Sequence, residues 1–373
     1  MDHAATTPVD EEVLNKMLPY FRRTYGNADS PHALGRKAMN AVDLARDTIA
    51  TLFNAKPQEV YFTSGGTESD NWAVFGGARA KAKEGKRHVI VSAIEHHAVL
   101  YAAKALEMQG FSVTYLPVNG AGRVEPNVLK TAIREDTGLV CVMAANNETG
   151  VLQPIQELAG IAHERGALFF TDAVQVAPYT EIDVKEWGVD MLSISSHKFY
   201  GPKGCGVLYI EEKVKAENIL FGGEQERGRR GGTTNVPAVV GMAEAYAKNC
   251  KELQIANEKI SCLRKLFLQE ISSLEGVKIN GEEGLPALLN LQIRGVENTA
   301  LLYKMDLQGI CFAAGSACAS ASVKPSHVLT AMGLTEEEAK SSVRISFGKD
   351  NTEEEVFKAA EIFVKTVQEL RKF

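Results

Sequence analysis

A lysine and an aspartate near the middle of the chain are the residues whose types and spacing most directly suggest chemistry. Asp172 follows the β-rich run at 168–171, and Lys198 lies 26 residues later, just after another run at 192–194. This separation is about one strand-helix-strand crossover, so both side chains can emerge at the same end of neighbouring strands. An amine there can form a Schiff base with an aldehyde cofactor, and an ionised aspartate can keep a pyridinium nitrogen protonated. Taken singly, Asp172 is more typical of a helix N-cap and Lys198 of a solvated loop, and Lys203 is a rival amine in a Gly-Pro-Lys-Gly turn.

The segment from Phe62 to Asn71 is suited to holding a phosphate. It runs off an expected strand through Gly65 and Gly66 into an expected helix. Glycines let backbone N–H groups approach an anion, and a helix N-terminus adds about half a positive charge. An ordinary strand-turn-helix with Thr67 as its N-cap explains the segment equally well. It is neither a Walker loop, because no Gly-Lys-Ser/Thr follows, nor a full dinucleotide fingerprint.

A cysteine and an arginine in the last quarter of the chain are further candidates. Cys318 lies in a run of small residues at 313–322. Such a loop buries little and can move, which suits a nucleophile that must change its position during a reaction. Arg344 is a charge inside an otherwise apolar expected strand. A guanidinium suits an amino-acid carboxylate, although a solvated edge residue is an equally good interpretation.

Several motifs occur in the order found in one enzyme family. The segment Ser-Ser-His-Lys-Phe-Tyr-Gly-Pro-Lys-Gly at 195–204 resembles the signature of the NifS/IscS-like cysteine desulfurases, which are class V aminotransferase relatives of fold type I. Further matching motifs are Thr-Ser-Gly-Gly-Thr-Glu at 63–68, Glu-His-His-Ala at 95–98, Asn-Asn-Glu-Thr-Gly at 146–150, Asp-X-X-Gln at 172–175 and Arg-Gly-Gly-Thr at 230–233. The resemblance spans nearly the whole chain, and motifs in order are more specific than any one alone.

The resemblance implies pyridoxal 5'-phosphate as the cofactor and assigns residues to it. Lys198 would be the Schiff-base lysine, Asp172 would contact the pyridine nitrogen, and Gln175 would contact the ring hydroxyl. His96 would stack on the ring, and Asn147 would lie near the hydroxyl and the substrate. The implied phosphate ligands are Gly66, Thr67, Ser195 and His197, with Thr233 reaching the phosphate of the other subunit of a homodimer. Outside the family, a lone histidine like His96 is more typical of packing or capping. A metal site on His96 and His97 is not expected, because adjacent residues rarely point the same way.

The resemblance also implies a reaction. Cys318 would receive sulfur from L-cysteine as a persulfide and release alanine, while Arg344 and Asn147 would hold the substrate carboxylate. His96 would assist proton transfer from the substrate thiol. The sulfur would pass to an acceptor protein, a scaffold or thiolation factor, for iron-sulfur clusters or other sulfur compounds. The long loop at 313–325 resembles the NifS/IscS group rather than the SufS-like group.

Other functions stay open on the sequence. A selenocysteine lyase or a β-eliminating C–S lyase would use the same fold. A non-catalytic binding partner in sulfur assembly is disfavoured by the intact pair of Lys198 and Cys318, and a nicotinamide dehydrogenase by the missing glycine fingerprint.

Two features depart from the family pattern, and a separate feature concerns the start of the chain. Residues 27–32 read Asn-Ala-Asp-Ser-Pro-His, which is looser than the usual Asn-Pro-X-Ser. Residues 2–7 look like the end of a strand with almost no strand before it, which is typical of a trimmed N-terminus. The chain stops at Phe373 without the tail by which housekeeping members dock an iron-sulfur scaffold, so the acceptor is left open.

The elements that must position these residues follow an α/β pattern. Short apolar runs begin near residues 60, 89, 113, 139, 168, 192 and 206 and alternate with helical stretches, as buried parallel strands require. We expect a fold type I transferase with a mostly parallel seven-stranded sheet in a large domain at 15–250. A smaller α/β domain would comprise residues 1–14 and 251–373, with expected strands at 288–293 and 343–346, and a final helix from about 352.

Composition excludes several classes of protein. The net charge of −6 disfavours a nucleic-acid partner, which normally needs a concentrated basic surface. No apolar run approaches the roughly 20 residues of a membrane span, so we expect a soluble protein without a membrane partner. The spacing of the six cysteines fits a reducing, cytoplasmic setting. We expect Cys141 and Cys311 in the core, Cys250 and Cys262 in helices as structural residues, and Cys205 in either kind of role.

Overall fold

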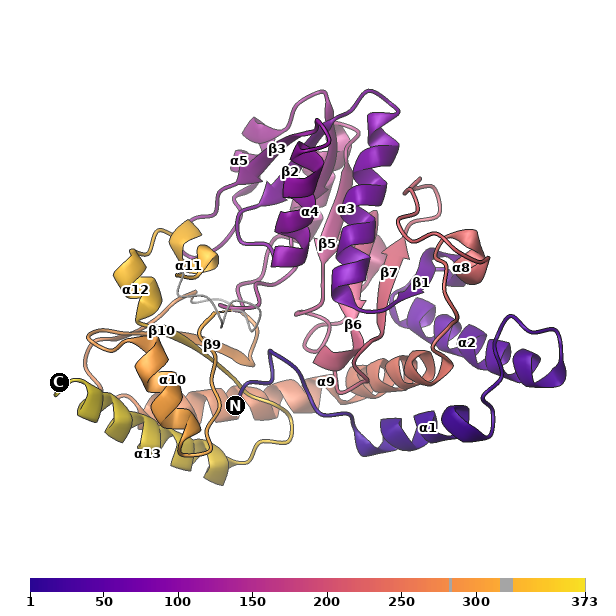
Figure 1. Ribbon diagram of the computed structural model, residues 1–373. Coiled ribbons are helices and arrows are strands. Elements are labelled where there is room, and N and C mark those ends of the chain that lie inside the picture. The colour runs from indigo at the N-terminus through magenta and orange to yellow at the C-terminus, as the bar shows by residue number, and fades with distance from the viewer. Residues whose placement is uncertain (282–283, 316–324, 373) are drawn as a thin grey trace.

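A seven-stranded sheet forms the centre of the larger part of the molecule. The computed structural model describes residues 1–281, 284–315 and 325–372. The strand order is β1-β7-β6-β5-β4-β2-β3 (Figure 1). The strands are β1 (Val60–Thr63), β2 (His88–Ser92), β3 (Ser112–Leu116), β4 (Thr137–Cys141), β5 (Leu168–Asp172), β6 (Met191–Ser195) and β7 (Gly206–Ile210). Strands β3, β2, β4, β5 and β6 are parallel, whereas β7 is antiparallel to both β6 and β1. The predicted mostly parallel seven-stranded sheet is confirmed.

Burial on both faces explains why these strands are continuous apolar runs. Every residue of β2, β4, β6 and β7 is buried. Alternate residues face opposite sides, so that Val89 and Val91 belong to one apolar cluster while Ile90 belongs to the other. Both faces of the sheet are therefore covered by helices, as parallel sheets require.

The helices of the larger part lie on both sides of this sheet (Figure 1). They are α1 (Glu11–Arg22), α2 (Ala33–Leu52), α3 (Gly66–Ala82), α4 (His97–Glu107), α5 (Pro126–Ala132), α6 (Ile155–Glu164), α7 (Val184–Trp187) and α8 (Gln225–Gly228), with short 3-10 turns η1 (Pro57–Glu59) and η2 (Ser196–Lys198). Helix α3 packs against β4, β5, β6 and β7, so its N-terminus is fixed over the middle of the sheet.

A smaller three-stranded antiparallel sheet follows in the order β10-β9-β8. Its strands are β8 (Val277–Ile279), β9 (Leu288–Ile293) and β10 (Ser342–Ser346), with helices α10 (Asn298–Asp306), α11 (His327–Ala331), α12 (Glu336–Lys340) and α13 (Glu353–Leu370). The 35-residue helix α9 (Val236–Glu270) packs on α1 and α2 at one end and α13 at the other. The boundary predicted near residue 250 falls inside this helix, and the division into two domains stays a prediction.

The N-terminal residues lie beside the smaller sheet (Figure 1). Asp2 forms a parallel bridge with Ser346 of β10, and the backbone N–H of Ala4 donates to the Ser346 side chain at 2.8 Å. At Thr7, five residues after Asp2, the chain contacts the turn that follows β6, since the N–H of Thr7 donates to the carbonyl of His197 at 3.0 Å. This segment therefore spans from the smaller sheet to the end of β6.

One cysteine prediction is wrong. Cys311 is exposed and lies outside any strand, because the neighbouring Phe312 is the side chain that packs inward, against Phe267 and Phe363. Cys141 is buried in β4 as predicted, and Cys205 is buried. No helix in the described ranges is both long and apolar enough to cross a membrane.

Candidate active site

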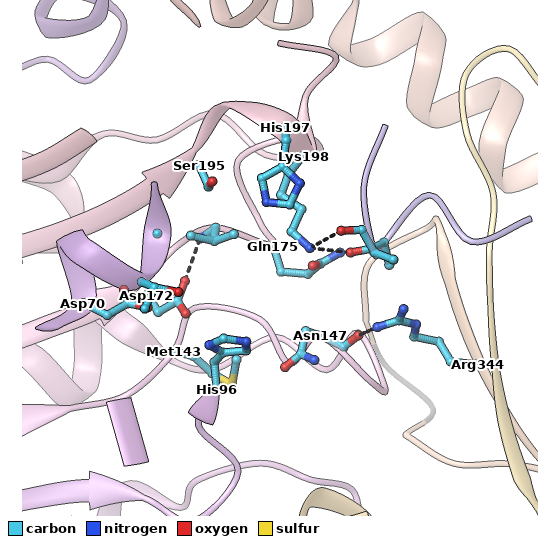
Figure 2. A pocket seen from close by; sticks show the side chains of 15 residues that line it. Asp70, His96, Met143, Asn147, Asp172, Gln175, Ser195, His197, Lys198 and Arg344 are labelled. Carbon is cyan, nitrogen blue, oxygen red and sulfur yellow. Dashed lines mark hydrogen bonds between the residues drawn. The ribbon is translucent and has the colours of Figure 1, made fainter. Parts of the chain in front are cut away.

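A cavity of about 200 Å³ lies at the carboxyl ends of β5 and β6 and gathers most of the predicted site residues (Figure 2). The predicted residues that line it are Gly66, Thr67, His96, Asn147, Asp172, Gln175, Ser195, His197, Lys198 and Arg344. The other lining residues, which were not predicted, are Ala4, Ala5, Asp70, Met143 and Val174. Ligands in open α/β sheets bind at this end of the strands, so the position is that of a binding site.

Asp172 and Lys198 face this cavity from adjacent parallel strands (Figure 2). Asp172 is the last residue of β5, and Lys198 ends the 3-10 turn that follows β6. The Lys198 Nζ donates to the carbonyl oxygens of Ala4 at 2.6 Å and Ala5 at 3.0 Å. The buried Asp172 Oδ1 accepts from the N–H of Val174 at 2.8 Å. Burial raises the pKa of Asp172 to about 6, although the Val174 N–H and the Lys198 charge oppose that rise.

A second carboxyl group lies in the same cavity. Asp70 is 1% exposed, and its Oδ1 accepts from the hydroxyl of Ser193 at 2.6 Å. Ser193 is the register partner of Asp172 across β5 and β6. Burial, and then the charge of Asp172, raise the pKa of Asp70 well above its ordinary value. Sequence reasoning missed Asp70, although its spacing of i+4 from Gly66 places both on one face of a helix.

His96 is both a helix cap and a cavity residue. Its Nδ1 accepts from the N–H of Ala98 at 3.2 Å as the N-cap of α4. Burial, and then the Lys198 charge, lower its pKa to about 4, so the ring is neutral near pH 7. Because Nδ1 accepts a hydrogen bond, Nε2 carries the proton. His96 therefore offers a hydrogen-bond donor at its other nitrogen.

The glycine turn at the start of α3 leaves room for an anion. Gly65, at φ 147°, is the N-cap and Gly66 the first residue of the helix, so Thr67 is not the cap. A Cβ on Gly66 would lie 3.0 Å from Val174 Cγ2 and 3.6 Å from Ser195 Cβ. His197 flanks the same cavity, with Nδ1 3.1 Å from the hydroxyl of Thr6, and burial lowers its pKa to about 4. Backbone N–H groups with small neighbours at a helix N-terminus are typical of a phosphate site.

Gln175 contributes to the cavity a side-chain oxygen that has no hydrogen-bond partner among the described residues. The Gln175 side chain is buried, and its Oε1 has no hydrogen-bond partner in the part of the chain that the structure describes. Burying an amide oxygen without a donor is costly, so the site is built for a donor that enters with a ligand.

Arg344 is buried rather than a solvated edge residue. It is 1% exposed, because β10 is covered on one side by Asn290 of β9 and on the other by a bridge to Ala313. Its two terminal nitrogens each donate at 2.8 Å, to the carbonyl oxygen of Asn147 and to the carboxylate of Asp2 (Figure 2 shows the first). Its Nε has no hydrogen-bond partner among the described residues.

Two predicted site residues are not placed in the cavity. Thr233 is exposed and does not line it. Cys318 and most of the predicted loop at 313–325 lie outside the described residues. The roles of both residues stay predictions.

Comparison with known proteins identifies the family. The family model described as aminotransferase class-V matches residues 1–358. A curated relative named cysteine desulfurase IscS from Methanosarcina thermophila is 46% identical over 373 residues, covering 100% of this chain and 92% of the relative. The chain belongs to the cysteine desulfurases of the class-V aminotransferase family. A putative cysteine desulfurase IscS 1 from Bacillus subtilis (strain 168) is 48% identical over 375 residues, covering 99% of this chain and 98% of that protein. A solved structure titled as a NifS-like protein superposes with a TM-score of 0.92 at 37% identity, covering 98% of each chain.

Proposed function

We propose that this cysteine desulfurase uses pyridoxal 5'-phosphate to convert L-cysteine to L-alanine and keeps the sulfur on Cys318 as a persulfide. The observation that carries the proposal is the pairing of a buried Asp172 with the Lys198 amine at the ends of adjacent strands in one cavity. A carboxylate for a ring nitrogen and an amine for an aldehyde are what this cofactor requires.

The described residues fit the cofactor at four points. The turn at Gly66 leaves space for a phosphate that a Cβ would partly fill. The Oε1 of Gln175, which has no hydrogen-bond partner among the described residues, could accept from a donor such as a ring hydroxyl. Lys198 would hold the aldehyde carbon covalently, and Asp172 would contact the ring nitrogen. When bound, the cofactor withdraws electrons from the substrate, which makes the proton on Cα removable.

Four residues would bind the substrate and move its protons. Arg344 presents a buried guanidinium for the substrate carboxylate, with Asn147 beside it. Lys198, once its nitrogen is neutral, would carry the Cα proton. His96 presents a donor at Nε2, so it would first donate a hydrogen bond to the substrate sulfur and accept a proton only after releasing its own.

The sulfur transfer itself is assigned to Cys318. The Cys318 thiolate attacks the substrate sulfur, a sulfur-sulfur bond forms, and the carbon-sulfur bond breaks. The electron pair of the broken bond stays with the three-carbon fragment, which takes up a proton and leaves as alanine. An ordinary thiol is only a few per cent ionised at pH 7, so the reaction depends on the thiolate fraction.

The assembly and cell biology of the enzyme are also part of the proposal. We propose a homodimer in which the exposed Thr233 reaches the phosphate bound by the partner subunit. We further propose a cytoplasmic enzyme that passes sulfur to an acceptor protein, either a scaffold or a thiolation factor. The exposure of Thr233, away from its own cavity, supports the first of these.

Labelled sulfur tests the proposal directly. Cofactor-loaded protein is mixed with one equivalent of L-cysteine labelled with radioactive sulfur, without reductant, and the protein-bound label is counted. We expect label on the wild type and on Cys311→Ser, a matched control because Cys311 is exposed and lies outside the cavity. We expect no label on Cys318→Ser. Full labelling of Cys318→Ser would place the sulfur on another cysteine, and full turnover by it without protein-bound label would indicate a β-eliminating lyase instead.

A further inference from the structure

The first residues of the chain form a strap that contacts both cations of the cavity. We define the N-terminal strap as residues 2–7. Its Asp2 carboxylate accepts from Arg344, and its carbonyl oxygens at Ala4 and Ala5 accept from Lys198. Its ends are fixed by backbone contacts to β10 and to the turn after β6. The strap therefore joins the group expected to bind the substrate carboxylate to the group expected to bind its amine.

Asp2 is the counter-ion of a buried charge. The Arg344 side chain is 2% exposed and that of Asp2 26%, and the pair is 2.8 Å apart. A buried guanidinium without a counter-ion is strongly unfavourable, because removing it from water costs several kcal/mol. Asp2 supplies the only carboxylate within ion-pair distance of Arg344 among the residues that the structure describes.

The contacts of Arg344 fix its plane and leave one side unused. A guanidinium has five N–H groups in a rigid, planar fork. The Asp2 carboxylate accepts from one terminal nitrogen and the Asn147 carbonyl from the other. Two contacts on different nitrogens prevent rotation of the plane, and within the described part of the chain the Nε–H has no hydrogen-bond partner. A carboxylate that enters the cavity meets a guanidinium that is already oriented.

We propose that Asp2 is a positioning residue for the substrate carboxylate, which acts by holding the Arg344 guanidinium in its binding orientation. The inference rests on the proposed function, because it takes Arg344 as the group that binds the carboxylate. Asp2 does not line the cavity, so it would act on the substrate only by holding Arg344. A preoriented group loses less entropy on binding, so Asp2 strengthens binding rather than the chemical step.

The experiment compares Asp2→Asn, Asp2→Ala and Asp2→Glu with Arg344→Ala and with the double variant Asp2→Ala/Arg344→Ala. The holoenzyme is assayed for KM and kcat with L-cysteine, and L-alanine binding is measured by calorimetry as a readout independent of turnover. Asp10→Asn is the matched control, because Asp10 also pairs with cations, Lys248 and Lys349, but outside the cavity. Should Asp2→Ala fail to fold, Asp2→Asn, which keeps the side-chain shape, takes its place in the double variant.

We expect Asp2→Asn and Asp2→Ala to raise KM and to weaken L-alanine binding by about tenfold or more, the usual cost of a hydrogen bond to a charged group. The value of kcat should change by less than about threefold, since the chemical step keeps its groups. Asp2→Glu should recover part of the affinity, and Asp10→Asn should match the wild type. In the Arg344→Ala background the Asp2 substitution should change KM and L-alanine binding little further, because the effects of substituting residues that act through one another are not additive.

Other results distinguish a failure of the Asp2 inference from a failure of the proposed role of Arg344. An unchanged or lower KM in Asp2→Asn would show that Asp2 only competes with the substrate and would overturn the inference. An equal effect of the Asp2 substitution with and without Arg344 would also overturn it. If Arg344→Ala itself leaves KM unchanged, the carboxylate role of Arg344 in the proposed function fails, and the inference fails with it.

Discussion

The Nζ of Lys198 lies 2.6 Å from the carbonyl oxygen of Ala4, a residue 194 positions earlier in the chain. A carbonyl oxygen accepts a hydrogen bond from an amine, so this contact orients the Lys198 side chain. The amine is thereby directed into the cavity that also contains Asp172 (Figure 2).

This geometry predicts that Lys198 alone becomes linked to the cofactor. Borohydride reduction of the loaded wild type followed by peptide mass spectrometry should find the cofactor mass on the peptide that contains Lys198. Lys198→Ala should show no such mass and no turnover. Lys203→Ala is the matched control, because Lys203 is exposed in a nearby turn, and it should behave like the wild type. A cofactor mass on Lys203 in the wild type would contradict the assignment.

Asp172→Asn should retain the fold but lose turnover. The amide keeps the size of the carboxyl but carries no charge to hold a ring nitrogen protonated. The value of kcat should fall by at least about tenfold, the scale of a hydrogen bond between charged groups. Steady-state rates at constant cofactor occupancy measure the effect. Asp183→Asn, at the N-cap of α7 and outside the cavity, is the control, and equal rates in both variants would refute the role of Asp172.

The buried His88 should make stability depend on pH. Its two ring nitrogens each lie 2.8 Å from a threonine hydroxyl, of Thr137 and Thr114, and burial lowers its pKa from 6.5 to about 4. Between these values the unfolded chain binds more protons, so this residue makes the free energy of unfolding fall as the pH falls from 6.5 to 4. Denaturant unfolding of His88→Gln should show a pH slope smaller by up to about 1.4 kcal/mol per pH unit. An unchanged slope would show that His88 is charged in the folded protein.

Breaking the ion pair of Arg46 and Glu226 should destabilise the fold. Both side chains are buried. The Glu226 carboxylate accepts hydrogen bonds from two nitrogens of Arg46, at 2.7 and 2.9 Å, and from the backbone N–H of Phe62. Removing one partner of such a pair leaves a buried charge, so Glu226→Ala should lower the free energy of unfolding by about 3–5 kcal/mol. Glu212→Ala breaks an exposed pair with Lys56, which solvent screens, so it should change the free energy of unfolding far less than Glu226→Ala. Similar losses in the two variants would show that burial does not set the cost.

The strands and most of the cavity residues could be predicted because their signals are local. Strands β2, β4, β6 and β7 are apolar runs in which every residue is buried, and short runs of this kind are typical of parallel strands covered on both faces. Asp172 and Lys198 could be paired because one crossover separates them along the chain. The antiparallel direction of β7 was not predicted, although the short link from Ser195 to Gly206 indicates it, since a parallel crossover takes a dozen or more residues.

The features that sequence reasoning missed depend on contacts between distant segments. Asp2 meets Arg344 only because the N-terminal strap pairs with β10, and nothing near either residue indicates this contact. Cys311 looked like a core residue because apolar neighbours surround it in the sequence, but the backbone there turns Phe312 inward instead. Side-chain direction in an irregular segment is set by tertiary packing rather than by periodicity.

The products formed from L-cysteine test the central claim most directly. The cofactor-loaded protein is incubated with L-cysteine and dithiothreitol, and alanine, pyruvate and sulfide are quantified together. A cysteine desulfurase that carries sulfur on Cys318 predicts alanine equal to sulfide, with no pyruvate above the background. Pyruvate equal to sulfide would contradict it, because sulfur would then leave by elimination without passing through Cys318.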